Sequence, residues 1–369
     1  MRIENRILGL DILRSIAITQ VLLIHSVYLL PDIQKEWLLK VIPTIDGVSI
    51  FFVLSGFLIG GILLREIENK EFELKNLAQF WMRRWFRTLP NYFLIILILF
   101  LYDILIYKTN SHLSFRYLFF AQNFFSNHPD FFPEAWSLSV EEWFYLLFPG
   151  ACYILFKVFT IRRHAVFASI LFFLLIPFFL RTIAIFNYND DLILRNVVIF
   201  RLDSLMYGVV GAYLFRSYSK IWNGTKNQSL LVSIILLLLL FFAHLTLPKE
   251  HFFWRSFVFN IESIVTLAAL PFFSNLKRIR FTWLAKTFTF ISIVSYSMYV
   301  LNLSIIQWRI IPIFLSITNL RSLDPILLKA LSFFLFWPFL IVSSYLMFRF
   351  YERPMTNLRD YFATSGNNV

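Results

Sequence analysis

Long apolar runs separated by short polar connections make up most of this 369-residue chain. A helix that crosses a bilayer needs about 20 consecutive, mostly apolar residues, and about ten runs of this kind can be recognised. They lie near residues 7–30, 44–64, 91–108, 138–160, 164–186, 194–215, 228–247, 253–274, 284–308 and 327–349. The pattern therefore predicts an all-α polytopic membrane protein with about ten transmembrane helices around a charged central cavity.

The Lys and Arg residues between the apolar runs alternate between richer and poorer connections. The richer ones are the N-terminus, the connections near residues 65–90, 157–163, 216–226 and 277–286, and the C-terminal tail. Because basic residues concentrate on the cytoplasmic side of a membrane, this alternation predicts that both termini are cytoplasmic. The first apolar run contains an acid and an arginine and lacks a small-residue cleavage site, so we expect no cleavable signal peptide.

The composition supports the same class of protein. Hydrophobic residues make up 59% of the chain, which is more than a soluble protein of this length can bury. The net charge of +12 is scattered over short connections, which favours contact with the lipid bilayer and excludes nucleic acid as the expected partner. The single cysteine, Cys152, excludes an intramolecular disulfide and a multi-cysteine metal site. We expect neither a metal nor a tightly bound cofactor.

Charged residues inside an apolar run indicate a functional site, and the first run contains Asp11, Arg14 and His25. A spacing of eleven residues places Arg14 and His25 on one helix face, about 16 Å apart along the axis. His25 is suited to act as a general base toward a hydroxyl, although a structural histidine is an equal alternative. Arg14 either pairs with Asp11 or faces a cavity where it binds an anion.

Three arginines, Arg83, Arg84 and Arg87, precede the third apolar run. On a helix Arg83 and Arg87 share a face and Arg84 flanks it. Arginine side chains bind phosphates well, so the string predicts a site for a phosphate-rich ligand. Anchoring at the membrane interface is the alternative.

A second string, from Trp136 and Ser137 to Glu141 and Glu142, opens the fourth run. Adjacent residues on a helix diverge by about 100°, so at most one glutamate should point toward His25. A carboxylate there would hold the tautomer of the imidazole. Favourable interaction with the helix dipole is the simpler explanation for one of the two acids.

The sixth run places Arg201 and Asp203 at mid-membrane on different faces, so each should pair with another helix. A structural pair and a substrate site are equally compatible with this spacing. Glu262 is a further buried-looking acid without a partner that the sequence identifies.

These strings, taken in order, resemble the membrane acyltransferase-3 family, whose members modify bacterial surface glycans. The resemblance covers about residues 8–355. It rests on Arg14-x10-His25, the string FFVLSGFLI at 51–59, Arg83-Arg84-x-x-Arg87-x-x-Pro90, residues 136–142, Arg201-x-Asp203-x-Leu205-x-x-Gly208, Ser295-Tyr296-x-x-Tyr299 and Tyr351-Glu352-Arg353-Pro354. Relatives often carry a histidine where this chain has Asn302, which cannot exchange protons near neutral pH. We expect one membrane domain over 1–369, with its core at about 7–355, a short cytoplasmic tail at 356–369 and no appended hydrolase-like domain.

The resemblance implies an O-acyltransferase of the bacterial cytoplasmic (inner) membrane. It would move an acyl group, most simply acetyl, from cytoplasmic acyl-CoA to a hydroxyl of a surface glycan such as O-antigen, lipopolysaccharide or exopolysaccharide. In this scheme the three arginines of the third run bind coenzyme A phosphates, Arg14 guides or polarises the thioester, and His25 is the base, oriented by Glu142 or Glu141. The expected substrate-binding residues are Trp136, Ser137, Arg201, Asp203 and Asn302.

Other functions remain compatible with the sequence. A transporter or flippase of a lipid-linked or small anionic substrate would also have intramembrane charges, and a silent scaffold is a third class. Within the enzyme class, the acceptor is a glycan, a lipid-linked sugar or a small metabolite.

Overall fold

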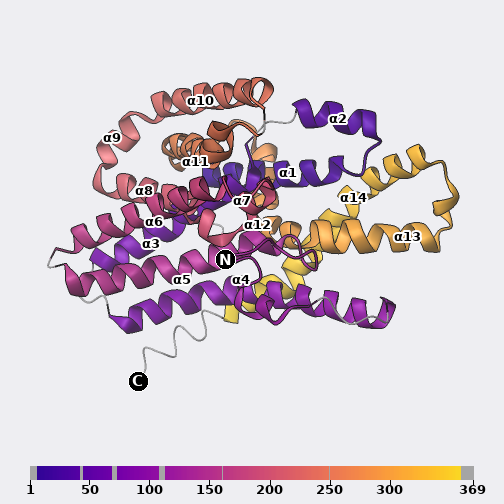
Figure 1. Ribbon diagram of the computed structural model, residues 1–369, viewed down its shortest axis with the longest axis horizontal. Coiled ribbons are helices and arrows are strands. Elements are labelled where there is room, and N and C mark those ends of the chain that lie inside the picture. The colour runs from indigo at the N-terminus through magenta and orange to yellow at the C-terminus, as the bar shows by residue number, and fades with distance from the viewer. Residues whose placement is uncertain are drawn as a thin grey trace.

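The computed structural model describes residues 6–41, 45–68, 73–107, 113–159, 161–248 and 250–358, and the regular elements in these ranges are all helices, with no strand (Figure 1). The long helices are α1 (Leu8–Val27), α3 (Gly47–Glu68), α4 (Leu74–Tyr102), α5 (Ala135–Val158), α6 (Arg162–Ala184), α8 (Leu202–Ser217), α10 (Lys226–Thr246), α11 (Phe252–Asn275), α12 (Thr282–Leu301) and α14 (Pro325–Met347). The shorter helices are α2 (Asp32–Val41), α7 (Asp191–Asn196), α9 (Ser219–Gly224) and α13 (Ile311–Ile317). The 3-10 helices are η3 (Phe115–Phe119), η4 (Val198–Phe200) and η6 (Leu320–Ser322), and the π-helical turns are η2 (Asp103–Tyr107), η5 (Asn302–Ile310) and η7 (Phe348–Glu352).

The predicted all-α polytopic fold is confirmed, since each predicted apolar run overlaps one long helix. Eight helices in the described ranges are long and apolar enough to cross a membrane. The other two predicted runs correspond to α5 and α8. Helix α5 carries two adjacent glutamates, and α8 has only 16 residues. Most of the predicted tail lies outside the described residues.

Two predicted boundaries were wrong. Helix α4 begins at Leu74 rather than near residue 91, so the arginine string lies within the helix. A hydropathy window ends at charged residues even when a helix continues and turns those residues toward a cavity. Helix α8 begins at Leu202 rather than near residue 194, because the short helices α7 and η4 interrupt the apolar run before it.

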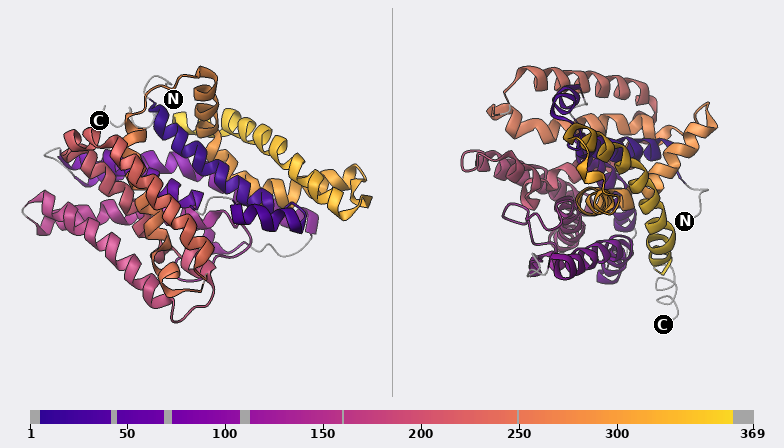
Figure 2. Two further views of the ribbon diagram at one scale, coloured as in Figure 1. Left: turned by 90° about the horizontal axis from the view of Figure 1, so that it is seen from above. Right: turned by 90° about the vertical axis from the view of Figure 1, so that its right-hand side faces the viewer.

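Helix α10 lies at the edge of the bundle (Figure 1), whereas α3 packs against α1, α5, α8 and α11 (Figure 2 gives two further views of the bundle). In the apolar windows of the two helices, 72% of α3 is buried but only 11% of α10. The remaining surface of α10 is therefore available to lipid. Helices α1, α8, α11 and α12 have intermediate positions, and α1 packs against α3 and α12. Helices α1, α3 and α12 contribute residues to the candidate site, together with α4, α5, α7 and η5.

Helices α3 and α8 approach closely where Gly56 faces Gly208. A Cβ added to Gly56 would lie 1.8 Å from the Leu205 carbonyl oxygen, and one added to Gly208 would lie 2.1 Å from the Val53 carbonyl oxygen. Small residues commonly allow such contacts between membrane helices. Neither position can accept a side chain unless the two backbones separate.

We expect Gly56→Ala to destabilise the protein, because overpacking a helix interface typically costs about 1–3 kcal/mol. Gly61→Ala is the matched control, since an added Cβ there meets no atom within 4 Å. Thermal unfolding midpoints in detergent, followed by size-exclusion chromatography, measure the difference. Equal midpoints for the two variants would contradict the close contact.

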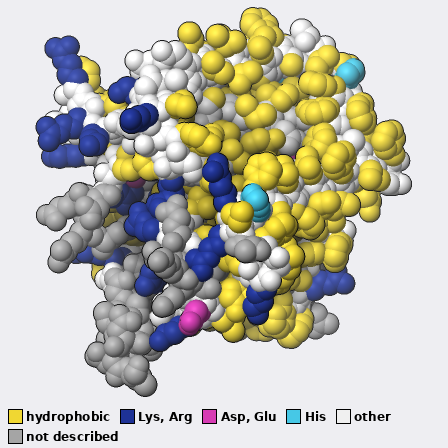
Figure 3. All heavy atoms as spheres, turned by 90° about the vertical axis from the view of Figure 1, so that its left-hand side faces the viewer, with side chains coloured by type: hydrophobic (Ala, Val, Ile, Leu, Met, Phe, Trp, Pro, Cys, Tyr) yellow, Lys and Arg dark blue, Asp and Glu magenta, His cyan; other side chains and the backbone are white. Residues whose placement is uncertain are grey.

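Lys and Arg side chains predominate over Asp and Glu on the face shown in Figure 3. This face belongs to the end of the molecule where α5 passes to α6 and α8 passes to α9. The positive-inside rule associates such a face with the cytoplasm. The cytoplasmic location of the termini stays a prediction.

Candidate active site

Helix α1 contributes to two separate cavities. Arg14 lines the first, which we call the arginine cavity, and His25 lines the second, which we call the histidine cavity. Eleven helical residues place their backbones about 16 Å apart along the axis. The two side chains therefore face different chambers of one molecule, as their spacing predicts.

The arginine cavity lies among α1, α3, α4, α5 and α12 and has about 730 Å³ of empty space. Three guanidinium groups and one carboxylate face it, so its polar surface carries an excess of positive charge. Its lining consists of Arg14, Val48, Phe51, Phe52, Ser55, Leu58, Ile59, Arg84, Arg87, Thr88, Ser137, Leu138, Glu141, Ser295, Tyr296 and Tyr299.

The predicted arginine string divides between this cavity and the surface. Arg84 and Arg87, three residues apart on α4, line the cavity, whereas Arg83 is exposed and does not. Of the three arginines predicted to bind a phosphate-rich ligand, the structure therefore brings only Arg84 and Arg87 to the cavity. The Arg84 guanidinium lies over the Tyr145 ring, 4.2 Å from the centroid, and its Nε atom is buried without a hydrogen-bond partner among the described residues.

Arg14 does not form the alternative ion pair with Asp11. Asp11 accepts instead from Arg6, at 2.5 Å and 3.0 Å, and from the Ser292 hydroxyl at 2.7 Å. This network connects the start of α1 to α12. Arg14 is left facing the arginine cavity, as the functional interpretation of the sequence requires.

The two glutamates of α5 do not contact His25, so the predicted contact was wrong. Glu141 lines the arginine cavity and accepts from Ser55 at 3.0 Å and from the Tyr145 hydroxyl at 2.8 Å. Glu142 is buried and accepts from Thr88 at 2.6 Å. Both acids lie one helical turn or more beyond the start of α5, which is the part of the helix that faces the histidine cavity.

The histidine cavity has about 970 Å³ of empty space and lies among α1, α7, η5 and the segments that precede α3 and α5. Aromatic and charged side chains face it together. Its lining consists of Val21, Ile24, His25, Asp46, Val48, Asn127, His128, Asp130, Pro133, Glu134, Trp136, Leu192, Arg195, Asn196, Tyr299, Leu303 and Trp308.

Asn302 takes the place beside His25 that a glutamate was expected to occupy. His25 Nδ1 lies 2.5 Å from Asn302 Oδ1, and Asn302 Nδ2 donates to the Tyr299 carbonyl oxygen at 2.5 Å. Because the carbonyl can only accept, the amide oxygen must face the imidazole. Nδ1 of His25 then carries the proton, and Nε2 keeps a lone pair for a proton from a ligand.

We expect Asn302→Leu to reduce the acyl-transfer activity that the sequence resemblance implies about 10-fold to 100-fold, because the imidazole loses the acceptor that fixes its tautomer and orientation. Asn302→Gln keeps the amide but moves it, and should recover less than wild-type activity. Turnover at several pH values, with folding checked by size exclusion, measures the effect. Full activity of Asn302→Leu would show that this hydrogen bond has no functional role.

Asn302 is held at a backbone irregularity between α12 and α13. The π-helical turn η5 begins at this residue, and Glu134 accepts from the backbone N–H groups of Leu303 and Ser304 at 2.9 Å and 2.7 Å. Glu134 also accepts from the Ser304 hydroxyl. Burial raises the pKa of the Glu134 carboxyl to about 6, although these hydrogen bonds oppose the shift. Such π-turns often occur at functional sites.

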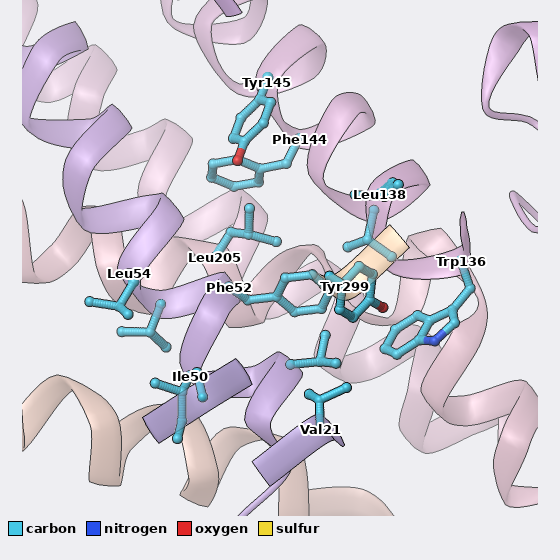
Figure 4. Packing of buried hydrophobic residues seen from close by; sticks show 14 of the residues in the cluster. Val21, Ile50, Phe52, Leu54, Trp136, Leu138, Phe144, Tyr145, Leu205 and Tyr299 are labelled. Atoms are coloured by element: carbon cyan, nitrogen blue, oxygen red, sulfur yellow. The ribbon is translucent and has the colours of Figure 1, made fainter. Parts of the chain in front are cut away.

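A thin wall separates the two cavities. Val48 and Tyr299 line both of them, and the neighbours Trp136 and Ser137 line one each. The Tyr299 and Ser137 hydroxyls share a hydrogen bond of 2.7 Å. Figure 4 shows Tyr299 close to Phe52 and Trp136 in this part of the core. A ligand in one cavity is therefore separated from the other by about one layer of side chains.

A family model described as an acyltransferase domain, acyltransferase-3, matches residues 7–350. The chain belongs to this family. This acyltransferase-3 domain is 28% identical over 329 residues to a Staphylococcus aureus (strain COL) protein named "Putative O-acetyltransferase SACOL0978". The aligned region covers 81% of this chain and 50% of the relative. No solved structure matches it.

Two further relatives carry more specific names. The O-acetyltransferase OatA of S. aureus (strain NCTC 8325 / PS 47) is 26% identical over 57% of this chain and 35% of its own length. The peptidoglycan O-acetyltransferase OatA of Listeria monocytogenes is 34% identical over 30% of this chain and 20% of its own length. The acyltransferase-3 domain thus spans half or less of the curated relatives that it matches.

The structure places two predicted substrate-binding residues of the acyltransferase-3 domain outside both cavities. Asp203 is fully buried and forms an ion pair of 2.9 Å with Arg181. Arg201, also fully buried, donates to Ser49 at 3.0 Å and lies over the Phe259 ring at 3.9 Å. Neither residue lines the two cavities. Their placement matches the other interpretation, in which each pairs with a neighbouring helix.

Sequence reasoning missed the ion pair of Asp46 and Arg195 in the histidine cavity, where Nε and Oδ2 are 2.9 Å apart. Each residue lies at the start of a predicted apolar run, where a charged side chain is ordinarily solvated at the membrane interface. His128 lies in the long connection between the third and fourth predicted apolar runs, where no pattern singled it out. Burial lowers the pKa of His128 to about 4, so its imidazole is neutral at pH 7.

Proposed function

We propose that this chain transfers an acyl group, most simply acetyl, from acyl-CoA in the arginine cavity to a hydroxyl of a cell-surface glycan in the histidine cavity. The observation that carries the proposal is the pair of chemically different cavities that share the wall formed by Val48 and Tyr299. A cationic chamber suits a phosphate-rich donor, and a chamber with an oriented histidine suits a hydroxyl acceptor.

Arg84, Arg87 and Arg14 bind the donor in this proposal. Guanidinium groups bind phosphate oxygens through paired hydrogen bonds, and the cavity presents three of them to one carboxylate. On the predicted topology this chamber opens to the cytoplasm, where acyl-CoA is present. The thioester end of the pantetheine arm then reaches the wall at Tyr299.

His25 is the base. Nε2 accepts the proton of the acceptor hydroxyl, the hydroxyl oxygen attacks the thioester carbonyl, and the carbon–sulfur bond breaks. The imidazolium returns its proton to the departing coenzyme A thiolate, so protons and electrons balance. Attack requires the two reacting atoms to approach within about 3–3.5 Å, so in this proposal the side chains of the wall move aside and the reaction occurs where the two cavities meet. The Ser137 and Tyr299 hydroxyls, which lie at the wall, are the neutral donors for the developing oxyanion in this proposal.

The glycan acceptor is supported by the relatives. Two are named O-acetyltransferase OatA, one of them for peptidoglycan. O-antigen, exopolysaccharide and peptidoglycan sugars all present the required hydroxyl. A bacterial inner-membrane location follows from this chemistry, because the donor is cytoplasmic and the acceptor lies outside.

Purified protein in nanodiscs, supplied with labelled acetyl-CoA and the surface glycan of the cells that carry this chain, tests the proposal. We expect glycan-dependent release of coenzyme A and labelled O-acetyl esters on the glycan by mass spectrometry. In vesicles, movement of unmodified glycan without acetylation would identify a transporter. If the folded protein neither acetylated nor moved the glycan, both functions would be refuted.

A further inference from the structure

A third cavity continues from the histidine cavity toward the outside of the bundle. It lies among α1, α2, α7, α10 and α11 and has about 1180 Å³ of empty space. The two cavities share four lining residues, Ile24, Asp46, Leu192 and Arg195. We call the third cavity the tryptophan groove, after Trp254 on α11. Because the lining is shared, one extended ligand can occupy both spaces.

The charges of the tryptophan groove are paired. Arg195 faces Asp46 at 2.9 Å, and Arg255 faces Asp191 at 2.7 Å. Glu262 accepts from the Ser49 hydroxyl at 2.6 Å. Three carboxylates and two guanidinium groups leave no excess of positive charge. The groove therefore does not select for an anion, in contrast to the arginine cavity.

Polar atoms nevertheless remain available at the junction with the histidine cavity. The Arg195 side chain is 35% exposed, and only its Nε atom is used in the pair with Asp46. The Asp191 side chain is 55% exposed. These groups offer both donors and acceptors, which is the requirement for binding neutral hydroxyl groups.

An aromatic surface accompanies these polar groups. Trp254 is half-buried and its ring lies 5.7 Å from that of His244. The Trp254 indole N–H makes no hydrogen bond with any residue that the structure describes. Indole groups at binding surfaces combine a broad apolar face with one polar donor. This combination suits the apolar face and the hydroxyl edge of a sugar ring.

A hydrocarbon chain fits the groove less well. It would cover two ion pairs and Glu262 without forming hydrogen bonds to their remaining polar atoms, and burial of unsatisfied charged groups is costly. The groove is thus better matched to an uncharged, hydroxyl-rich ligand than to a lipid tail.

We propose that the tryptophan groove binds the neutral sugar units adjacent to the one that is acylated, so that the preferred acceptor is an extended glycan rather than a single sugar. This inference rests on the proposed function, because it takes the acylated sugar to be in the histidine cavity. The groove then determines acceptor length, and Trp254 is a specificity-determining residue that does not touch the reacting atoms.

The probe is the surface glycan of the cells that carry this chain, deacetylated, partly hydrolysed and separated into fractions of one to several sugars. We expect kcat/KM of the wild type to rise with chain length. Trp254→Ala should reduce the ratio of kcat/KM for long over single-sugar acceptors about threefold to tenfold, since one aromatic contact has that effect. Trp254→Phe should restore part of the ratio.

Trp283→Ala is the matched control, because Trp283 is 65% exposed on α12 and does not line the groove. An unchanged ratio in Trp254→Ala, or no length preference in the wild type, would overturn the inference. A groove that binds lipid would also overturn the inference. In that case kcat/KM for a prenyl-linked single sugar would rise as much as kcat/KM for a long glycan, and Trp254→Ala would abolish that rise.

Calorimetric titration of the long fraction into protein without acetyl-CoA separates this inference from the proposed function. Binding by the wild type that weakens in Trp254→Ala supports the groove even if no fraction is acetylated, in which case only the proposed reaction has failed. No binding difference between the two proteins overturns the groove, whatever the turnover.

Discussion

His25→Ala should reduce glycan acetylation about 100-fold to 10,000-fold, the range in which a general base contributes to catalysis. The imidazole is held by Asn302 with Nε2 directed away from that hydrogen bond, and no other histidine makes this contact among the described residues. Alanine leaves no group to accept the hydroxyl proton at neutral pH. Labelled acetyl transfer to glycan in nanodiscs measures the loss.

The affinity for coenzyme A should remain unchanged in His25→Ala, because His25 lines only the histidine cavity and not the arginine cavity. His164→Ala is the control for removing a histidine, since His164 is exposed on α6. If His25→Ala retained more than a tenth of the wild-type rate, His25 would not be the base. A parallel loss of coenzyme A affinity would instead indicate that the variant disturbs the fold.

The helices were predictable from the sequence because hydropathy acts over many residues. An apolar run of about 20 residues has few alternatives to a membrane helix, so the overall fold followed. The ends of helices were less predictable where a helix contains charged residues. The start of α4 was missed because Arg84 and Arg87 turn toward a cavity inside the protein, and hydropathy does not distinguish a cavity from water.

Side-chain partners in the site were less predictable still. Helical spacing correctly separated Arg14 from His25, because both residues belong to one rigid helix. The partner of His25 comes from η5, which is 277 positions away in the chain, and spacing within one helix contains no information about such contacts. An acid was expected there on chemical grounds, but the hydrogen bond requires only an acceptor, which Asn302 provides.

The missed residues have a common physical reason. Asp46, Glu134 and Arg195 all lie beside the ends of apolar runs, where charged side chains are normally solvated. In the folded protein Asp46 and Glu134 lie in loops and Arg195 lies on the short helix α7, and all three line the histidine cavity. Loop conformation depends on tertiary contacts, so the sequence alone assigns these residues to the membrane interface.

The double variant Arg84→Ala with Arg87→Ala should raise KM for acetyl-CoA about 100-fold or more. A hydrogen bond to a charged group typically contributes about 1.5–3 kcal/mol, which corresponds to about 10-fold to 100-fold for each arginine. Arg83→Ala is the matched control, because Arg83 belongs to the same string but is exposed outside the cavity. Initial rates over a range of donor concentrations give KM and kcat separately.

S-acetylpantetheine, which has the thioester but lacks the phosphates of coenzyme A, makes this test specific. The wild type and Arg83→Ala should prefer acetyl-CoA strongly, whereas the double variant should lose most of that preference without losing activity toward S-acetylpantetheine. The preference of the wild type should also weaken as salt rises, because ions screen charge–charge attraction. If the double variant kept the wild-type preference, Arg84 and Arg87 would be structural, and the donor phosphates would have to bind elsewhere. The arginine cavity would then lose its assignment, while the role of His25 would still stand on its own test.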